Sequence, residues 1–227
     1  MASSDFTESD NVIPSEHSRL CVRFVDALPI TGAAVSVFGG MVLETSICAS
    51  DPLAARLDEM QFDLGEGPRW EAMRSRLPVH DAHVQRSGLN KWPMFGSALK
   101  QTGVEAIFVY PLSVAAFDVG VVELYSLTPG NLSARDDDIA QALASETAWT
   151  LLDHLLSMQE ASRSGEPRDS APLSRREIHQ ATGMVLVQME SNSTEALLVM
   201  RAHAFSHDRS LRDVASDVVE RRLVFAA

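Results

Sequence analysis

The 227-residue sequence lacks any run of about 18 apolar residues, so no segment is predicted to span a membrane. Its first 14 residues are polar and acidic, without the basic start and apolar core of a signal peptide. We therefore expect residues 1–15 to form a disordered tail and the chain to be cytoplasmic. The sequence has only two cysteines, Cys21 and Cys48, which match no metal or redox motif. We expect both to be buried, unpaired thiols in a reducing compartment.

The sequence also lacks the motifs of common catalytic sites. It contains no glycine-rich phosphate loop, Walker motif or nucleophile elbow, and no Ser/His/Asp or Cys/His set. His80 and His83 are possible metal ligands, but a strand would direct them to opposite faces, which is poor geometry for chelation. We expect no enzymatic activity, no cofactor and no metal.

The composition is that of a globular protein, with 45% hydrophobic and 22% charged residues. Its net charge of −12 lies entirely within residues 1–170. Residues 171–227 carry seven arginines, no lysine and seven acidic residues, so they are neutral. The acidic body would repel a nucleic acid, whereas the C-terminal part would not.

Residues 16–150 alternate between helical and strand patterns and predict an α+β domain with a mainly antiparallel sheet. Two β-type runs flank Gly39 and Gly40, which predicts a hairpin. Further strands are expected near residues 79–84, 106–112 and 119–125. Helices are expected at residues 16–28, 52–61, 69–76 and 93–103, and one long helix from residue 134 to about 160.

The long helix has an apolar stripe with spacings of three and four residues. This stripe could pack on the sheet of its own domain or form a coiled-coil seam, and we favour a seam that makes the chain a homodimer. Residues 161–173 have little apolar content and are expected to form a linker. The stripe consists of Ala144, Ala148, Leu151, Leu155 and Met158.

The last part of the chain predicts three short helices, each with its own start signal. Ser174, Asn192 and Ser210 are candidate N-caps, and each is followed by an acidic residue at the third position. An apolar stripe at helical spacing follows each cap. Helices this short are not stable alone, so a three-helix bundle is expected within residues 162–227.

The residues of these three helices resemble an ANTAR domain. The resemblance rests on the run from Glu177 to Met184, on Glu195 and Ala196, on residues 200–202 and on residues 211–215. It implies a module that binds RNA hairpins in transcription antitermination, typically as a dimer. The chain departs from the family pattern at Thr182, where a lysine is usual. The resemblance leads us to expect an RNA-binding face made of Gln180, Thr182, Gly183, Arg201, His203, Asp208, Arg209 and Arg212.

The preceding domain resembles a GAF domain, a small sensory module. The resemblance covers roughly residues 17–150. Many proteins that pair GAF and ANTAR domains have a cysteine after the Gly-Glu-Gly-Pro motif, but this chain has Arg69, so no redox or metal role is expected there. The resemblance rests on residues 65–68, 79–81, 92–93, 103–104, 110–112 and 120–125. It implies a ligand pocket that could be lined by Phe38, Phe62, Trp70, Trp92 and Phe95, although such aromatic residues are more often plain core.

Together these patterns suggest a signal-responsive regulator in which a GAF-like sensor controls an RNA-binding output. The alternative is a signalling protein whose C-terminal bundle binds a protein partner. The neutral charge of the bundle, the acidic body and Thr182 favour that alternative. The signal would be an unidentified small molecule or protein.

Overall fold

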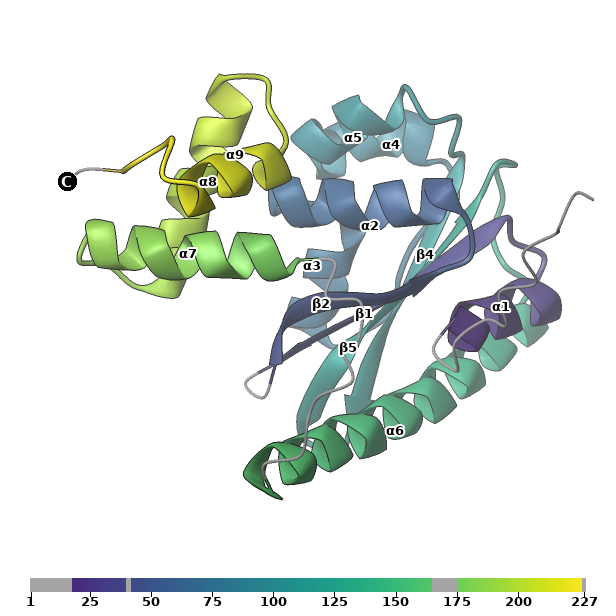
Figure 1. Cartoon of the computed structure of the whole chain (residues 1–227). Coiled ribbons are helices and arrows are strands. Elements are labelled where there is room, and N and C mark those ends of the chain that lie inside the picture. Colours follow the sequence, from purple (N-terminus) through teal and green to yellow (C-terminus); the bar gives the residue numbers. More distant parts are fainter. Residues whose placement is uncertain (1–17, 40–41, 165–174, 226–227) are drawn as a thin grey trace, which may run out of the picture.

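The computed structural model describes residues 18–39, 42–164 and 175–225. The expected tail at residues 1–15, the candidate cap Ser174 and the expected linker at residues 161–173 lie wholly or largely outside these residues. Within them, an α+β domain precedes a helical C-terminal bundle, which we define as residues 175–225 (Figure 1). We call residues 18–164 the sensor domain, a label that follows the resemblance described above and states no function.

The sensor domain is built on a five-stranded antiparallel sheet with the order β2-β1-β5-β4-β3. The predicted hairpin around Gly39 and Gly40 is confirmed, because β1 pairs with β2 across this turn. The strands are β1 (Gly32–Gly39), β2 (Val42–Ala49), β3 (Val79–Asp81), β4 (Ala106–Val114) and β5 (Phe117–Ser126).

Helices cover both faces of this sheet (Figure 1). One face packs against α1 (Ser18–Ala27) and α6 (Ala134–Ser164). The other face packs against α2 (Pro52–Leu64), α3 (Pro68–Ser75), α4 (Val84–Lys91) and α5 (Pro93–Leu99). Burial on both faces explains why β4 and β5 read as almost continuous apolar runs.

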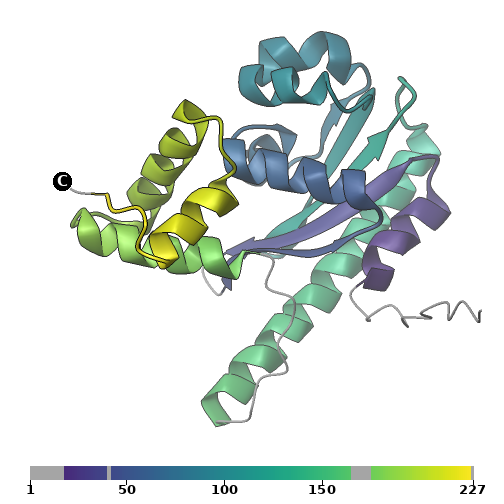
Figure 2. The ribbon, with the colours of Figure 1, turned by 45° about the horizontal axis from the view of Figure 1, so that its top comes forward.

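The apolar stripe of α6 packs on the sheet, which corrects the coiled-coil interpretation. Ala144, Ala148, Leu151 and Leu155 belong to the same core as the inward residues of β4 and β5. The side chain of Met158 is outside the described part. A stripe at spacings of three and four fits a sheet as well as a partner helix, so periodicity alone could not separate the two. Figure 2 shows α6 running along the sheet and beyond its edge.

The two cysteines form a disulfide, contrary to the expectation of free thiols. Cys21 on α1 is joined to Cys48 on β2, and both are buried as expected. They are 27 residues apart in the sequence and belong to no motif, so their approach depends on how α1 packs on the sheet. The bond ties α1 to the outermost strand of the sheet.

Candidate nucleic-acid interface

The C-terminal bundle contains the three expected helices. They are α7 (Arg176–Gln188), α8 (Ser193–Ser206) and α9 (Leu211–Val219). The predicted caps of the last two are confirmed, because Asn192 accepts the N–H of Glu195 and Ser210 accepts the N–H of Asp213. The bundle core is Ile178, Ala181, Val185, Ala196, Met200, Ala204, Leu211, Val214, Ala215 and Val218.

The eight residues expected to contact RNA do not form one continuous exposed face. Gln180 and Gly183 lie on the outer side of α7, and a Cβ added at Gly183 would meet no atom within 4 Å. The exposed residues Asp208, Arg209 and Arg212 lie on the α8–α9 turn and the first turn of α9. The structure therefore offers two exposed groups of the expected residues.

Asp208 is a turn residue that directly precedes the exposed Arg209. Asp208 has a φ of 52°, the left-handed conformation of a turn residue, and it is followed by Arg209 at the start of the next segment. The Arg209 guanidinium lies 2.6 Å from Asp217 on α9. This pair is at the surface, where a phosphate could compete for the guanidinium.

Thr182 and His203 are less exposed than the two groups described above. Thr182 is buried, and its hydroxyl donates to the Ile178 carbonyl one turn earlier at 2.8 Å. A hydroxyl held in this way is directed at the backbone of its own helix and not at a ligand. His203 stacks on His207 with 4.1 Å between the ring centres. Partial burial lowers the pKa of His203, and the neighbouring His207 lowers it further.

Arg201 is turned away from solvent and toward the sensor domain. Its guanidinium lies 5.1 Å from the ring centre of Phe62 and 5.4 Å from that of Trp70. It also donates to the Phe62 carbonyl at 2.6 Å. Burial lowers the pKa of Arg201. A Cβ at Gly65 would lie 3.1 Å from this guanidinium, so the glycine turn leaves room for it.

A buried cluster of charges lies where the bundle meets the sensor domain, and the sequence reasoning missed it. Its centre is Arg69 of α3, which is 0% exposed and occupies the position where many proteins that pair GAF and ANTAR domains have a cysteine. The guanidinium lies 2.7 Å from Asp58 of α2, 2.8 Å from Glu44 of β2 and 3.3 Å from Glu123 of β5. The one feature of the sequence that could have indicated this cluster was the charged residue Arg69 beside the Gly-Glu-Gly-Pro turn.

Arg175, directly before α7, is the contribution of the bundle to this cluster. It lies 2.8 Å from Asp58 and 3.1 Å from Glu44, and its guanidinium is 3.9 Å from the ring centre of Phe62. Only 4% of this arginine is exposed. The paired carboxylates offset the cost of burying it, as charges in an interior require.

The cluster shifts the ionisation of its carboxyl groups in opposite directions. Burial alone would raise the pKa of Asp58, but Arg69 and Arg175 outweigh it and hold that pKa below its usual range. Burial raises the pKa of Glu123 to about 7, with Arg69 opposing the shift and Asp58 adding to it. Glu123 also accepts a hydrogen bond from the Gln61 amide.

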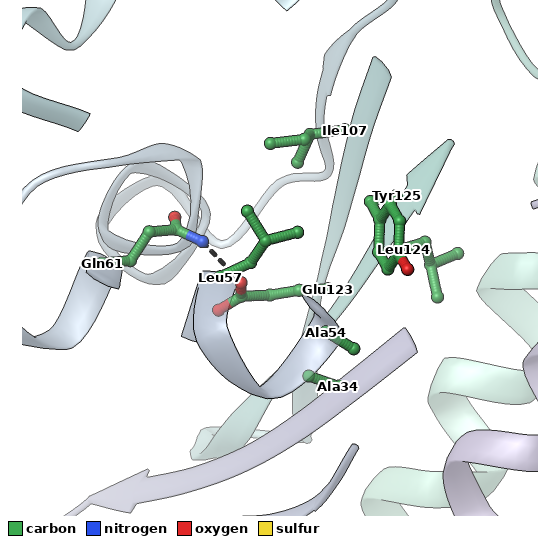
Figure 3. Close-up of a pocket in the computed structure, with 8 residues that line it drawn as sticks. All are labelled: Ala34, Ala54, Leu57, Gln61, Ile107, Glu123, Leu124 and Tyr125. Carbon is green, nitrogen blue, oxygen red and sulfur yellow. Dashed lines mark hydrogen bonds between the residues drawn. The ribbon is translucent and has the colours of Figure 1, made fainter. Parts of the chain in front are cut away.

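A small cavity lies beside Glu123, between α2 and the sheet (Figure 3). Its enclosed volume is about 10 Å³, room for about one water molecule and not for a small-molecule ligand. None of the five aromatic residues predicted to line a pocket borders it. Phe38, Trp92 and Phe95 belong to the sensor core, and Phe62 and Trp70 lie at the contact with the bundle. The lining residues are Ala34, Ala54, Leu57, Gln61, Ile107, Glu123, Leu124 and Tyr125.

Several motif residues behind the GAF resemblance hold the fold together. Glu66 accepts the N–H groups of Met94 and Phe95 at 2.8 and 3.0 Å, which caps the start of α5. Asp81 accepts from the Ser87 hydroxyl and the Lys91 ammonium. Within the described residues, no group of three or more His, Cys, Asp or Glu side chains could hold a metal ion, and no helix is long and apolar enough to cross a membrane.

Comparison with known proteins identifies the bundle. Residues 169–219 match the ANTAR domain family. The C-terminal bundle is an ANTAR domain. The exposed arginine Arg209 and the inward-facing Arg201 and Thr182 are therefore residues of this ANTAR domain. Comparison with curated proteins finds none that matches this chain.

Solved structures resemble the sensor domain that precedes the ANTAR domain. A domain of a putative two-component sensor histidine kinase from Sinorhizobium meliloti 1021 is 16% identical, with a TM-score of 0.52. The match covers 69% of this chain and 99% of that one. The GAF domain region of a putative membrane protein from Geobacter sulfurreducens is 14% identical, covers 60% of this chain and 89% of its own, and has a TM-score of 0.49. Identities this low concern the fold alone.

Proposed function

We propose that the chain is a signal-responsive RNA-binding regulator of transcription antitermination. In this proposal, the sensor domain is a GAF module and the C-terminal bundle is its output. The observation that carries the proposal is the ANTAR match on a three-helix bundle that presents exposed arginines. Arginine suits this role because its guanidinium pairs with phosphates and stacks on unpaired loop bases. The site of action would be the cytoplasm, where nascent transcripts lie.

The proposed regulator acts by binding and not by catalysis. RNA hairpins would be its partner on the output side, and a small molecule or protein its signal on the sensor side. Binding to paired hairpins would prevent formation of the terminator, which requires no reaction at the protein. Two populated conformations whose balance the signal shifts are sufficient for such control.

We further propose that the chain is a homodimer. The stripe of α6 that was expected to form the seam is used by the sheet, so a contact would use the outward side of this helix. Trp149 and Leu156 lie on that side, seven residues apart, and are 62% and 44% exposed. A large exposed aromatic residue next to a leucine favours a protein contact.

The second candidate function is protein binding by the bundle. Leu198 and Phe205 lie seven residues apart on α8 and are 62% and 66% exposed. This apolar stripe favours a protein partner, as the neutral charge of residues 171–227 also does.

Titration of the full chain against a pool of two-hairpin RNAs tests the proposed function. We expect saturable binding that is lost when the unpaired loop bases are changed and the stems are kept, because sequence-specific recognition of RNA targets loops. Equal binding to both sets would indicate a nonspecific charge interaction. Absence of binding would favour the protein partner.

A further inference from the structure

The sensor domain occupies three of the seven arginines of the C-terminal bundle. Arg175 and Arg201 contact Asp58, Glu44 and Phe62 as described above. Arg212 lies 3.3 Å from Glu59 on the exposed side of α2. Figures 1 and 2 both show the bundle against the end of α2. These contacts join the acidic domain to the arginine-bearing one.

The environment of Arg175 has the features of a specific guanidinium site. Two carboxylates from different elements, Asp58 and Glu44, each face one of its terminal nitrogens. The ring of Phe62 lies against the guanidinium plane at 3.9 Å. Carboxylate pairing and stacking on an aromatic ring are the two interactions for which arginine is preferred over lysine.

Other contacts surround this site and hold the bundle in the same position. A ring nitrogen of His179 lies 2.7 Å from the Glu44 carbonyl. Phe62 is 1% exposed and packs in the core of the bundle, although it belongs to α2. Arg201 lies over the same aromatic ring as Arg175. The bundle is thus docked by a buried polar centre with apolar contacts around it, the reverse of the apolar core and polar rim of most interfaces.

Docking uses two of the three arginines of the expected RNA face. Arg201 belongs to the expected RNA face, but its guanidinium is used by Phe62 and Trp70 of the sensor domain. Arg212, also expected in that face, is paired with Glu59. The Glu59 carboxylate thus stands where an RNA phosphate would be required at Arg212. Among the described residues, no carboxylate pairs with Arg176 or Arg221. Because carboxylates neutralise Arg175, Arg209, Arg212 and Arg222, the docked bundle has little positive charge left to attract RNA.

We propose that Arg175 is a latch that holds the C-terminal bundle closed against the sensor domain and so withholds Arg201 from RNA. This inference rests on the proposed function in its second half only, because the latch itself can be measured without RNA. For a chain in equilibrium between the docked and undocked states, the apparent association constant for RNA is the intrinsic constant multiplied by the undocked fraction. Linkage makes the effect reciprocal, so bound RNA favours the undocked state.

The test compares Arg175→Gln with Arg176→Gln. The two residues are adjacent and lose the same charge, but Arg175 is buried in the cluster, whereas Arg176 is exposed. Amide hydrogen exchange over the second half of α2 reports docking, because Phe62 is covered by the bundle. Binding of two-hairpin RNA to the same full-length chains reports release.

We expect Arg175→Gln to speed exchange in α2 and to raise RNA affinity by about tenfold. Arg176→Gln should increase neither the exchange rate in α2 nor the affinity for RNA. Loss of a positive charge ordinarily weakens binding to RNA, so a gain in affinity cannot come from nonspecific attraction.

Other outcomes separate the two levels of the argument. Unchanged exchange in Arg175→Gln would overturn the latch. Faster exchange with unchanged affinity, in a chain that does bind RNA, would overturn the inhibition. Faster exchange without any RNA binding would reject the proposed function and keep the latch as a contact between domains.

A second variant covers the case in which Arg175→Gln does not fold. Glu59 is 46% exposed at its side chain and lies outside the buried cluster, so Glu59→Arg should not disturb the core. It places a positive charge against Arg212 and leaves all arginines of the bundle intact. The latch predicts faster exchange in α2 and higher RNA affinity for this variant also, and unchanged values in both would contradict it.

Discussion

At the scale of single residues, Glu123 links the stability of the sensor domain to pH. Its pKa is raised by burial to about 7, from an ordinary value of 4.5. Because the folded chain holds this proton more tightly than the unfolded chain, the contribution of Glu123 to stability is present below about pH 4.5 and is lost as the pH rises to 7.

In the wild type we expect the free energy of unfolding to fall between pH 4.5 and 7, and we therefore expect Glu123→Gln to reduce this fall. At pH 8 the variant should be more stable than the wild type by on the order of 2 kcal/mol, measured by urea unfolding. Asp63, whose pKa burial raises to about 6, contributes a slope to both chains and cancels in the comparison. Glu71→Gln, on an exposed position of α3, is the control. A pH slope identical to that of the wild type would assign the titration to another group.

Arg209 is the exposed arginine of the expected RNA face whose removal should not disturb the fold. It pairs with Asp217 at the surface, as Arg222 does at 2.6 Å. We expect Arg209→Ala to lower RNA affinity by about tenfold, because one phosphate or base contact is lost. Arg222→Ala removes the other partner of Asp217 and lies outside the expected face, so it should have a smaller effect. Equal losses for both variants would mean that the face is misassigned.

At the scale of elements, the disulfide between α1 and β2 is a covalent addition to an already packed core. It closes a loop of 27 residues, and removing such a link from the unfolded chain typically costs about 2–4 kcal/mol. We expect the free energy of unfolding of the Cys21→Ala and Cys48→Ala double variant, measured with urea, to be lower than that of the wild type by this amount. The wild type measured with a reducing agent should match the variant. Equal stability of all three would show that the link contributes nothing.

The outward side of α6 is the element that the proposed dimer depends on. Trp149→Glu places a charge on this side, where the tryptophan is 62% exposed. We expect the variant to shift a dimer to a monomer in sedimentation equilibrium without loss of helical signal. Thr150→Glu, an adjacent exposed position, should leave the association unchanged. A variant that sediments as the wild type would place the dimer contact elsewhere.

At the scale of the whole molecule, local signals predicted the elements well, but not the ways in which they pack. The caps at Asn192 and Ser210 act within one helical turn, so the sequence alone locates them. The helix α4 was missed, because only Val84 and Leu89 of its eight residues are large and apolar and Gly88 is a poor helix former. The stripe of α6 was assigned to a partner helix although it faces the sheet, since both environments require the same spacing.

The contact between the two domains could not be predicted from the sequence. Glu44, Asp58, Arg69, Glu123 and Arg175 come from five separate segments and meet only in the folded chain. Arg201 was expected to face solvent because the three helices of the bundle were considered without the domain that packs against them. Charged residues in a sequence are usually solvated, so nothing local distinguishes an arginine that a neighbouring domain will bury.

The most direct test of the account is the dependence of RNA affinity on salt, measured for the wild-type and Arg175→Gln chains with a two-hairpin RNA. Phosphate contacts release counterions, so the account predicts that the logarithm of the association constant falls linearly with the logarithm of the salt concentration in both chains. The Arg175→Gln line should lie about tenfold higher. Absence of binding by both chains at the lowest salt, with both folded, would contradict the RNA-binding function and leave the protein partner as the role of the bundle.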